Sequence, residues 1–130
     1  MAKPSKCIPV AEAKALQDKW KETRALEIEQ AQGYQDTREF WYSLEELQEY
    51  LDYVKEQSTA QGINKPGIRI YFGAYAKTSL KKSYATMFLA PTKEKSAIIE
   101  GEEENSNNTE NNYDIEPLNT VTGGNPPKEY

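Results

Sequence analysis

Two segments of the chain consist mainly of apolar, aromatic and β-branched residues, and turn residues bound each of them. They cover residues 67–75 (GIRIYFGAY) and residues 84–90 (YATMFLA). This composition is typical of neighbouring strands, in which successive side chains point to opposite faces. The first strand is therefore predicted to place Ile68, Ile70, Phe72 and Ala74 on one face and Arg69, Tyr71, Gly73 and Tyr75 on the other.

Apolar residues at helical spacing predict a first helix over residues 9–32. Pro9 suits the first turn, because its missing N–H would be unbonded there anyway. Gly33 suits the left-handed conformation that ends many helices. The predicted apolar stripe consists of Ala13, Leu16, Trp20, Thr23, Ile28 and Ala31.

A second helix has a clearer start. Ser43 and Glu46 fit a capping box, in which the serine hydroxyl accepts from the Glu46 N–H, and Tyr42 and Leu47 fit a hydrophobic staple. Gly62 is the predicted end of the helix. The predicted apolar stripe consists of Leu44, Leu47, Leu51, Val54 and Ser58, flanked by Tyr50 and Tyr53.

A two-stranded hairpin is only marginally stable, so the sheet needs a third strand. Residues 96–99 (SAII) supply the remaining apolar run near the hairpin, and another copy of the chain is the alternative donor. The predicted fold is α+β, with two amphipathic helices packed on a small antiparallel sheet. The domain is expected to cover residues 9–99, after a flexible N-terminus of residues 1–8.

The composition changes at residue 100. Residues 1–98 carry 15 Lys and Arg against 13 Asp and Glu, whereas residues 99–130 carry one Lys against eight Asp and Glu. Such an acidic, Asn-rich stretch buries too little apolar surface to offset the entropy of ordering it. Residues 100–130 are therefore predicted to be a disordered acidic tail that folding does not need. A short apolar island at 113–118 within it is either a docking segment or an inert remnant.

The chain contains no histidine, and Cys7 is its only cysteine. These counts exclude intramolecular disulfides, Cys/His zinc sites and catalytic dyads or triads that use imidazole. No secretory signal or apolar run of membrane-spanning length is visible, which favours a cytoplasmic protein. We expect no catalytic residue, no metal site and no cofactor.

Carboxylate pairs are the remaining route to acid–base chemistry. Asp36 and Glu39 are one such pair, and Glu45 and Glu49 are another. Two alternatives are expected for Asp36, Arg38 and Glu39. They either form a small polar site beside Trp41 or remain solvated in the segment that connects the two helices. Pairs of this kind are common on solvated surfaces, so a carboxylate-based enzyme is only the third hypothesis.

The candidate binding residues lie on one strand face, in the loop after it and in the apolar island. They are Arg69, Tyr71, Tyr75, Lys77, Lys81, Lys82, Tyr113, Ile115 and Leu118. The leading hypothesis is a non-enzymatic module that binds another protein or a second copy of itself through the aromatic residues and the C-terminal segment. The alternative is weak binding of single-stranded nucleic acid, because aromatic rings beside lysines also bind unstacked bases. The first strand lacks the RRM signature, and a body charge near +2 is low for such a partner.

Two stretches of the chain resemble small uncharacterised proteins of Bacteroidota-type bacteria. They are the segment IRIYFGAY at residues 68–75 and the helix SLEELQEYLDYVK at residues 43–55. The resemblance covers roughly residues 10–92. It implies a bacterial cytoplasmic setting and carries no function.

Overall fold

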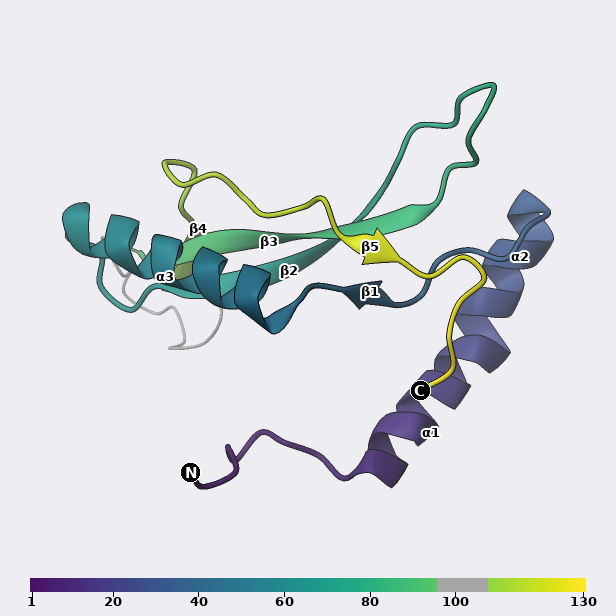
Figure 1. Ribbon diagram of the computed structural model, residues 1–130, viewed down its shortest axis with the longest axis horizontal. Helices are drawn as coiled ribbons and strands as arrows, with labels where there is room; N and C mark the ends of the chain where they lie inside the picture. The colour runs from purple at the N-terminus through teal and green to yellow at the C-terminus, as the bar shows by residue number, and fades with distance from the viewer. Residues whose placement is uncertain (96–107) are drawn as a thin grey trace. The chain divides into compact units, whose positions relative to one another are not determined.

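The computed structural model describes residues 1–95 and 108–130. The chain divides into two compact units (Figure 1). The larger unit is Phe40–Thr122, and the smaller unit joins Met1–Glu39 to Gly123–Tyr130. Helices and antiparallel sheets occur together, which confirms the α+β class.

The larger unit contains a three-stranded antiparallel sheet in the order β2-β3-β4. Strands β2 (Gly67–Ala74) and β3 (Ala85–Glu94) form the predicted hairpin, with Ile70 opposite Leu89 and Tyr71 opposite Phe88. The third strand is β4 (Thr109–Asn111), which pairs with the far end of β3. The strand predicted at residues 96–99 lies outside the described residues.

A proline in the central strand explains where the chain leaves the sheet after β4. Asn112 donates its N–H to the carbonyl of Pro91, and the chain returns to β3 at Leu118, which exchanges two backbone hydrogen bonds with Leu89. Pro91 has no N–H to offer between these points. Residues 113–117 therefore form a loop between the two points at which the chain bonds to β3.

Helix α3 (Leu44–Ala60) begins and ends as predicted. The Ser43 hydroxyl accepts from the Glu46 N–H at 3.0 Å. Gly62 adopts φ 67°, and the N–H groups of Gly62 and Ile63 bond to Thr59 O and Ser58 O. This is a Schellman motif, which uses carbonyls that the helix end leaves unbonded.

The core of the larger unit joins α3, β3 and the loop after β4. It consists of Tyr50, Val54, Leu89 and Ile115. Ile115 is only 2% exposed. The Tyr50 hydroxyl also donates to the carbonyl of Glu116 at 2.9 Å. The predicted disordered tail is therefore not confirmed for residues 108–130, because an apolar anchor and backbone hydrogen bonds offset the entropy of ordering this segment.

The predicted stripe of α3 is correct only in part. Val54 and Ser58 are buried, and Leu47 packs against the core. Leu44 and Leu51, by contrast, are 88% and 39% exposed. The contact face is rotated toward Tyr50, because α3 packs beside the segment that carries Ile115.

The smaller unit contains one long helical segment that ends at Gly33. It runs through α1 (Val10–Trp20), the π-helical turn η1 (Lys21–Ala25) and α2 (Leu26–Gln32). Pro9 is the residue before the helix and not its first member. The Thr23 hydroxyl donates to Lys19 O at 2.6 Å within this segment. Leu16 of the predicted stripe is 62% exposed.

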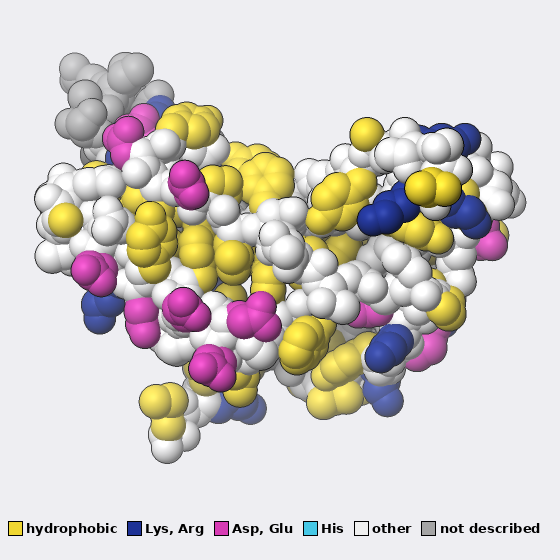
Figure 2. All heavy atoms as spheres, turned by 45° about the horizontal axis from the view of Figure 1, so that its top comes forward, with side chains coloured by type: hydrophobic (Ala, Val, Ile, Leu, Met, Phe, Trp, Pro, Cys, Tyr) yellow, Lys and Arg dark blue, Asp and Glu magenta, His cyan; other side chains and the backbone are white. Residues whose placement is uncertain are grey.

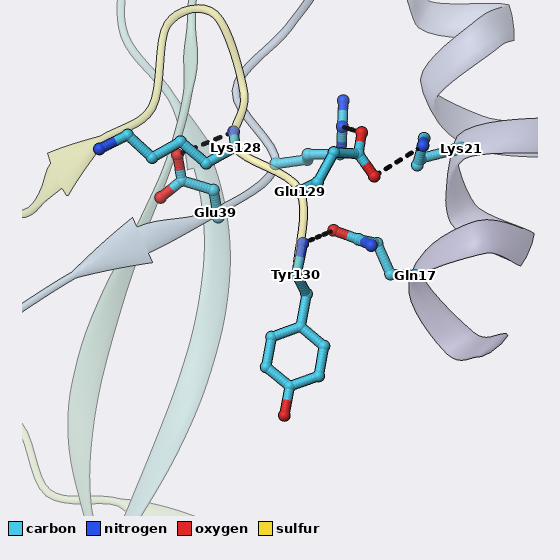
Figure 3. Close-up of polar contacts among 7 residues, drawn as sticks. Gln17, Lys21, Glu39, Lys128, Glu129 and Tyr130 are labelled. Atoms are coloured by element: carbon cyan, nitrogen blue, oxygen red, sulfur yellow. Dashed lines mark hydrogen bonds and ion pairs between the residues drawn. The ribbon is translucent and has the colours of Figure 1, made fainter. Parts of the chain in front are cut away.

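Polar contacts hold the C-terminal residues of the smaller unit (Figure 3). Glu129 pairs with Lys21 and with Arg38, each at 2.7 Å. The backbone N–H of Tyr130 donates to Gln17 Oε1 at 2.9 Å. A side chain at Gly124 would collide with the Glu39 carboxylate, so glycine allows this close approach.

A second, two-stranded sheet is formed by β1 (Phe40–Trp41) and β5 (Thr122–Gly123). Within residues 1–95 and 108–130, no helix has the length and apolar character that crossing a membrane requires.

Candidate functional site

Hydrophobic side chains reach the surface in several groups (Figure 2). In the larger unit, β2, β3, β4 and the loop after β4 together enclose an open groove of about 380 Å³. We call it the aromatic groove. It is lined by Tyr71, Phe88, Ala90, Pro91, Asn111, Asn112, Tyr113, Ile115, Glu116 and Pro117.

Two stacked rings form the aromatic pair of this groove. Tyr71 and Phe88 lie opposite each other in the β2–β3 register. Their ring centroids are 5.2 Å apart, and the rings are inclined by 18°. Tyr113 adds a third ring that is 89% exposed. Cross-strand aromatic pairs stabilise a sheet, and they also give this groove a rigid apolar surface.

A small polar network supports the rings. Arg69 donates from Nη1 to Asn111 Oδ1 at 2.7 Å and from Nη2 to Thr109 O at 3.1 Å. The Asn111 amide donates to the Tyr71 hydroxyl oxygen at 2.8 Å and lies 3.5 Å from the Tyr113 hydroxyl oxygen. Arg69 therefore orients Asn111, and Asn111 orients the rim of the groove.

This network also changes the acidity of Tyr71. The hydrogen bond from Asn111, followed by the influence of Arg69, lowers the pKa of the Tyr71 hydroxyl from its usual value of 10.0. Both partners favour the ionised oxygen, because each donates hydrogen or carries positive charge. The Tyr71 hydroxyl is therefore a stronger hydrogen-bond donor toward a ligand than an ordinary tyrosine.

The predicted binding residues separate into two groups. Tyr71, Tyr113 and Ile115 line the aromatic groove, and Arg69 supports it through Asn111. Ile115 contributes from the core, so it is not available as part of a flexible docking segment. Leu118 likewise packs against the core and bonds to Leu89.

Tyr75 and the lysines lie elsewhere on the larger unit. The Tyr75 hydroxyl donates to Asn119 Oδ1 at 3.1 Å and accepts from the Thr86 hydroxyl at 3.3 Å. Three exposed lysines follow in the β2–β3 loop, and none of them lines the groove. They are Lys77, Lys81 and Lys82.

The carboxylates of the proposed pairs accept hydrogen bonds from backbone N–H groups or lie on the surface. Asp36 Oδ1 accepts from the Thr37 N–H, and Glu39 Oε1 accepts from the Lys128 N–H at 3.4 Å. Glu45 and Glu49 are both exposed on α3. No group of three or more metal-ligating side chains occurs in the part of the chain that the structure describes.

Phe88, Asn111 and Pro117 were not among the predicted site residues. The alternation of strand residues predicts that Phe88 lies on the face opposite to Met87 and Leu89. Its pairing with Tyr71, however, depends on the register of the hairpin. Asn111 and Pro117 come from a segment with the composition of a disordered tail. The pairing of β4 with β3 brings Asn111 to the groove, and the bridge between Leu118 and Leu89 holds the neighbouring Pro117 there.

No family model, curated protein or solved structure matches this chain. The resemblance to proteins of Bacteroidota-type bacteria therefore stays a prediction.

Proposed function

We propose that this chain is a non-enzymatic protein-binding module, and that the aromatic groove binds an extended, proline-containing segment of another protein. The observation that carries the proposal is the stacked pair of Tyr71 and Phe88 beside the exposed ring of Tyr113. Proline-rich segments bind grooves lined by aromatic rings, because their extended helix is already formed and loses little entropy on binding.

The polar rim supports the same ligand. The Tyr71 oxygen accepts a hydrogen bond from Asn111 and keeps its own hydrogen for donation. A proline-rich segment exposes backbone carbonyls that have no partner within the segment. Donation from Tyr71 to one of these carbonyls would fix the register of the bound segment.

The test starts from peptides selected by the full-length chain from a displayed random library. Binding of each labelled peptide is then measured by fluorescence anisotropy. We expect Tyr113→Ser to weaken binding about tenfold or more, as for the aromatic anchors of other interfaces. Tyr130→Ser is the matched control, because Tyr130 is also exposed and does not line the groove. Failure to select proline-containing peptides, or equal binding by the Tyr113→Ser chain, would overturn the proposal.

Single-stranded nucleic acid is the second candidate, supported by the three exposed lysines in the loop beyond Tyr75. A labelled oligothymidine in the same anisotropy assay distinguishes the two. Binding to it would fall steeply as salt rises, because phosphate contacts release counterions. It would also be lost when Lys77, Lys81 and Lys82 are changed to Ser. We expect no such binding.

A further inference from the structure

Arg38 of the smaller unit has a buried donor that lacks an acceptor. The Arg38 side chain is only 6% exposed. Its Nη2 donates to Glu129 Oε1 at 2.7 Å. Its Nε–H, by contrast, is buried and has no partner in the part of the chain that the structure describes. A buried donor without an acceptor is costly, so it calls for an explanation such as an ion that binds there.

Lys21 is a second base at the Glu129 carboxylate (Figure 3). The carboxylate divides its two oxygens between the bases, because Oε1 accepts from Arg38 and Oε2 accepts from Lys21 Nζ at 2.7 Å. A guanidinium presents its Nε–H and an Nη2–H along one edge, which can donate two parallel bonds to one anion. The carboxylate has no third oxygen for the Nε–H.

The position of the Glu129 carboxylate is positive and can be reached from solvent. Lys21, and to a lesser extent Arg38, lower the pKa of Glu129 from its usual value of 4.5. The two bases therefore favour a negative charge at this position. The Glu129 and Lys21 side chains are 58% and 36% exposed. An anion from solution can therefore reach the two bases when Glu129 moves away.

We propose that Lys21 and Arg38 form a binding site for a phosphoryl group, either free phosphate or a phosphate monoester, and that Glu129 occupies this site when the ligand is absent. A phosphoryl group of this kind has at least three unesterified oxygens and about two negative charges. One oxygen accepts from Arg38 Nη2, a second from the Arg38 Nε–H and a third from Lys21 Nζ. The buried Nε–H thereby gains its acceptor. This proposal does not depend on the function proposed for the aromatic groove.

The number of oxygens separates this ligand from other anions. A free carboxylate and a phosphodiester each have only two unesterified oxygens, so neither would satisfy the three donors better than Glu129 does. The backbone of a nucleic acid is therefore not the expected ligand. Occupation of the site by Glu129 reduces the apparent affinity for phosphate, because only chains with a vacant site bind it. We expect weak binding that becomes tighter when Glu129 is removed.

The first test follows the arginine Nε–H signals of the full chain by NMR as inorganic phosphate is added. The chain has three arginines, Arg24, Arg38 and Arg69, so their signals can be followed separately. The Arg38 signal should shift downfield, because its donor gains an acceptor. Acetate and dimethyl phosphate at the same ionic strength should not shift it. An unchanged Arg38 signal, an equal response to acetate, or an equal shift at the exposed Arg24 would overturn the proposal.

The second test changes the site in both directions and measures the dissociation constant for phosphate in the same titration. Glu129→Ala should lower it about threefold to tenfold, because a tethered competitor has gone. Lys21→Gln should raise it at least about fivefold, because a charge-assisted bond is lost. Glu12→Ala and Lys19→Gln are the matched controls, since both residues are exposed on α1 and the changes in charge are the same. Unchanged or weaker binding by the Glu129→Ala chain would contradict the role of Glu129. These variants leave the buried Arg38 intact.

A third test identifies the source of the phosphoryl group with a short glycine-flanked phosphoserine peptide and its unphosphorylated form. Tighter binding of the phosphopeptide than of inorganic phosphate would identify a phosphorylated protein segment as the ligand. Equal or weaker binding would identify free phosphate, and either result supports the site. Equal binding of the two peptides to the full chain would reject it. Tyr113→Ser should leave phosphate binding unchanged, which separates this proposal from that of the aromatic groove.

Discussion

The two units hold the two parts of the C-terminal segment by different forces. In the larger unit, Ile115 is 2% exposed within an apolar core. In the smaller unit, all of which is described, no hydrophobic side chain is buried, and Glu129 and Tyr130 are held by ion pairs and hydrogen bonds. Burial of apolar area stabilises a fold strongly, whereas ion pairs with an exposed partner such as Glu129 contribute less. The larger unit should therefore resist perturbation, and the smaller unit should respond to charge, salt and pH.

The largest effect is expected from Ile115→Ala. Removing this side chain should lower the free energy of unfolding by about 2–5 kcal/mol, through lost burial and the cavity left behind. The measurement is urea unfolding followed by circular dichroism. Leu51→Ala is the control. Because Leu51 is 39% exposed, this substitution should lower the free energy of unfolding clearly less than Ile115→Ala does. Equal losses would show that the core does not centre on Ile115.

Tyr50 should make the larger unit sensitive to alkali. Burial, followed by the neighbouring Tyr53, raises the pKa of Tyr50 to about 12. A raised pKa contributes stability that is complete below the unfolded value near 10 and is lost as pH rises toward 12. Urea unfolding should thus show a fall in stability over this range.

Tyr50→Phe should remove the part of this fall that belongs to Tyr50. It should also cost about 1 kcal/mol at neutral pH, because the carbonyl of Glu116 loses its donor. Tyr53→Phe is the control, since Tyr53 is 43% exposed. An unchanged alkaline profile in Tyr50→Phe would contradict the assignment.

Loss of the N-cap of α3 should lower the free energy of unfolding by as much as Tyr50→Phe does, or by less. Ser43→Ala removes the acceptor for the Glu46 N–H and should cost about 1 kcal/mol. Ser43→Asp should retain most of the stability, because aspartate is also a good cap. Thermal unfolding of the three chains tests this order, and a Ser43→Ala chain as stable as the wild type would disprove the role of the cap.

The smallest effect on global stability is expected from Glu129→Gln. It should leave the urea midpoint of the larger unit unchanged and speed hydrogen exchange at the Tyr130 amide. Lys21, and to a lesser extent Arg38, lower the pKa of Glu129 from 4.5. These contacts are therefore complete above that pH and are lost as pH falls below it. Glu12→Gln is the control, and faster global unfolding in Glu129→Gln would mean that the two units do not differ as proposed.

Local patterns in the amino-acid sequence are sufficient to predict several elements of the fold. The start of α3 depends on Ser43 and Glu46, and its end depends on the left-handed Gly62. The β2–β3 hairpin follows from two short segments that are rich in apolar, aromatic and β-branched residues. Each of these signals acts within a few residues, so no knowledge of distant contacts is needed to recognise it.

Contacts between residues that are distant in the sequence depend on the folded arrangement of the chain. The composition of residues 100–130 predicts disorder because it averages over the whole segment. The anchor at Ile115, the pairing of β4 and the polar contacts of Glu129 and Tyr130 nevertheless hold parts of residues 108–130 in place. The same pairing brings Asn111 to Tyr71 and thereby forms the aromatic groove. Burial and hydrogen bonding between segments depend on register and position, and no local pattern in the chain encodes them.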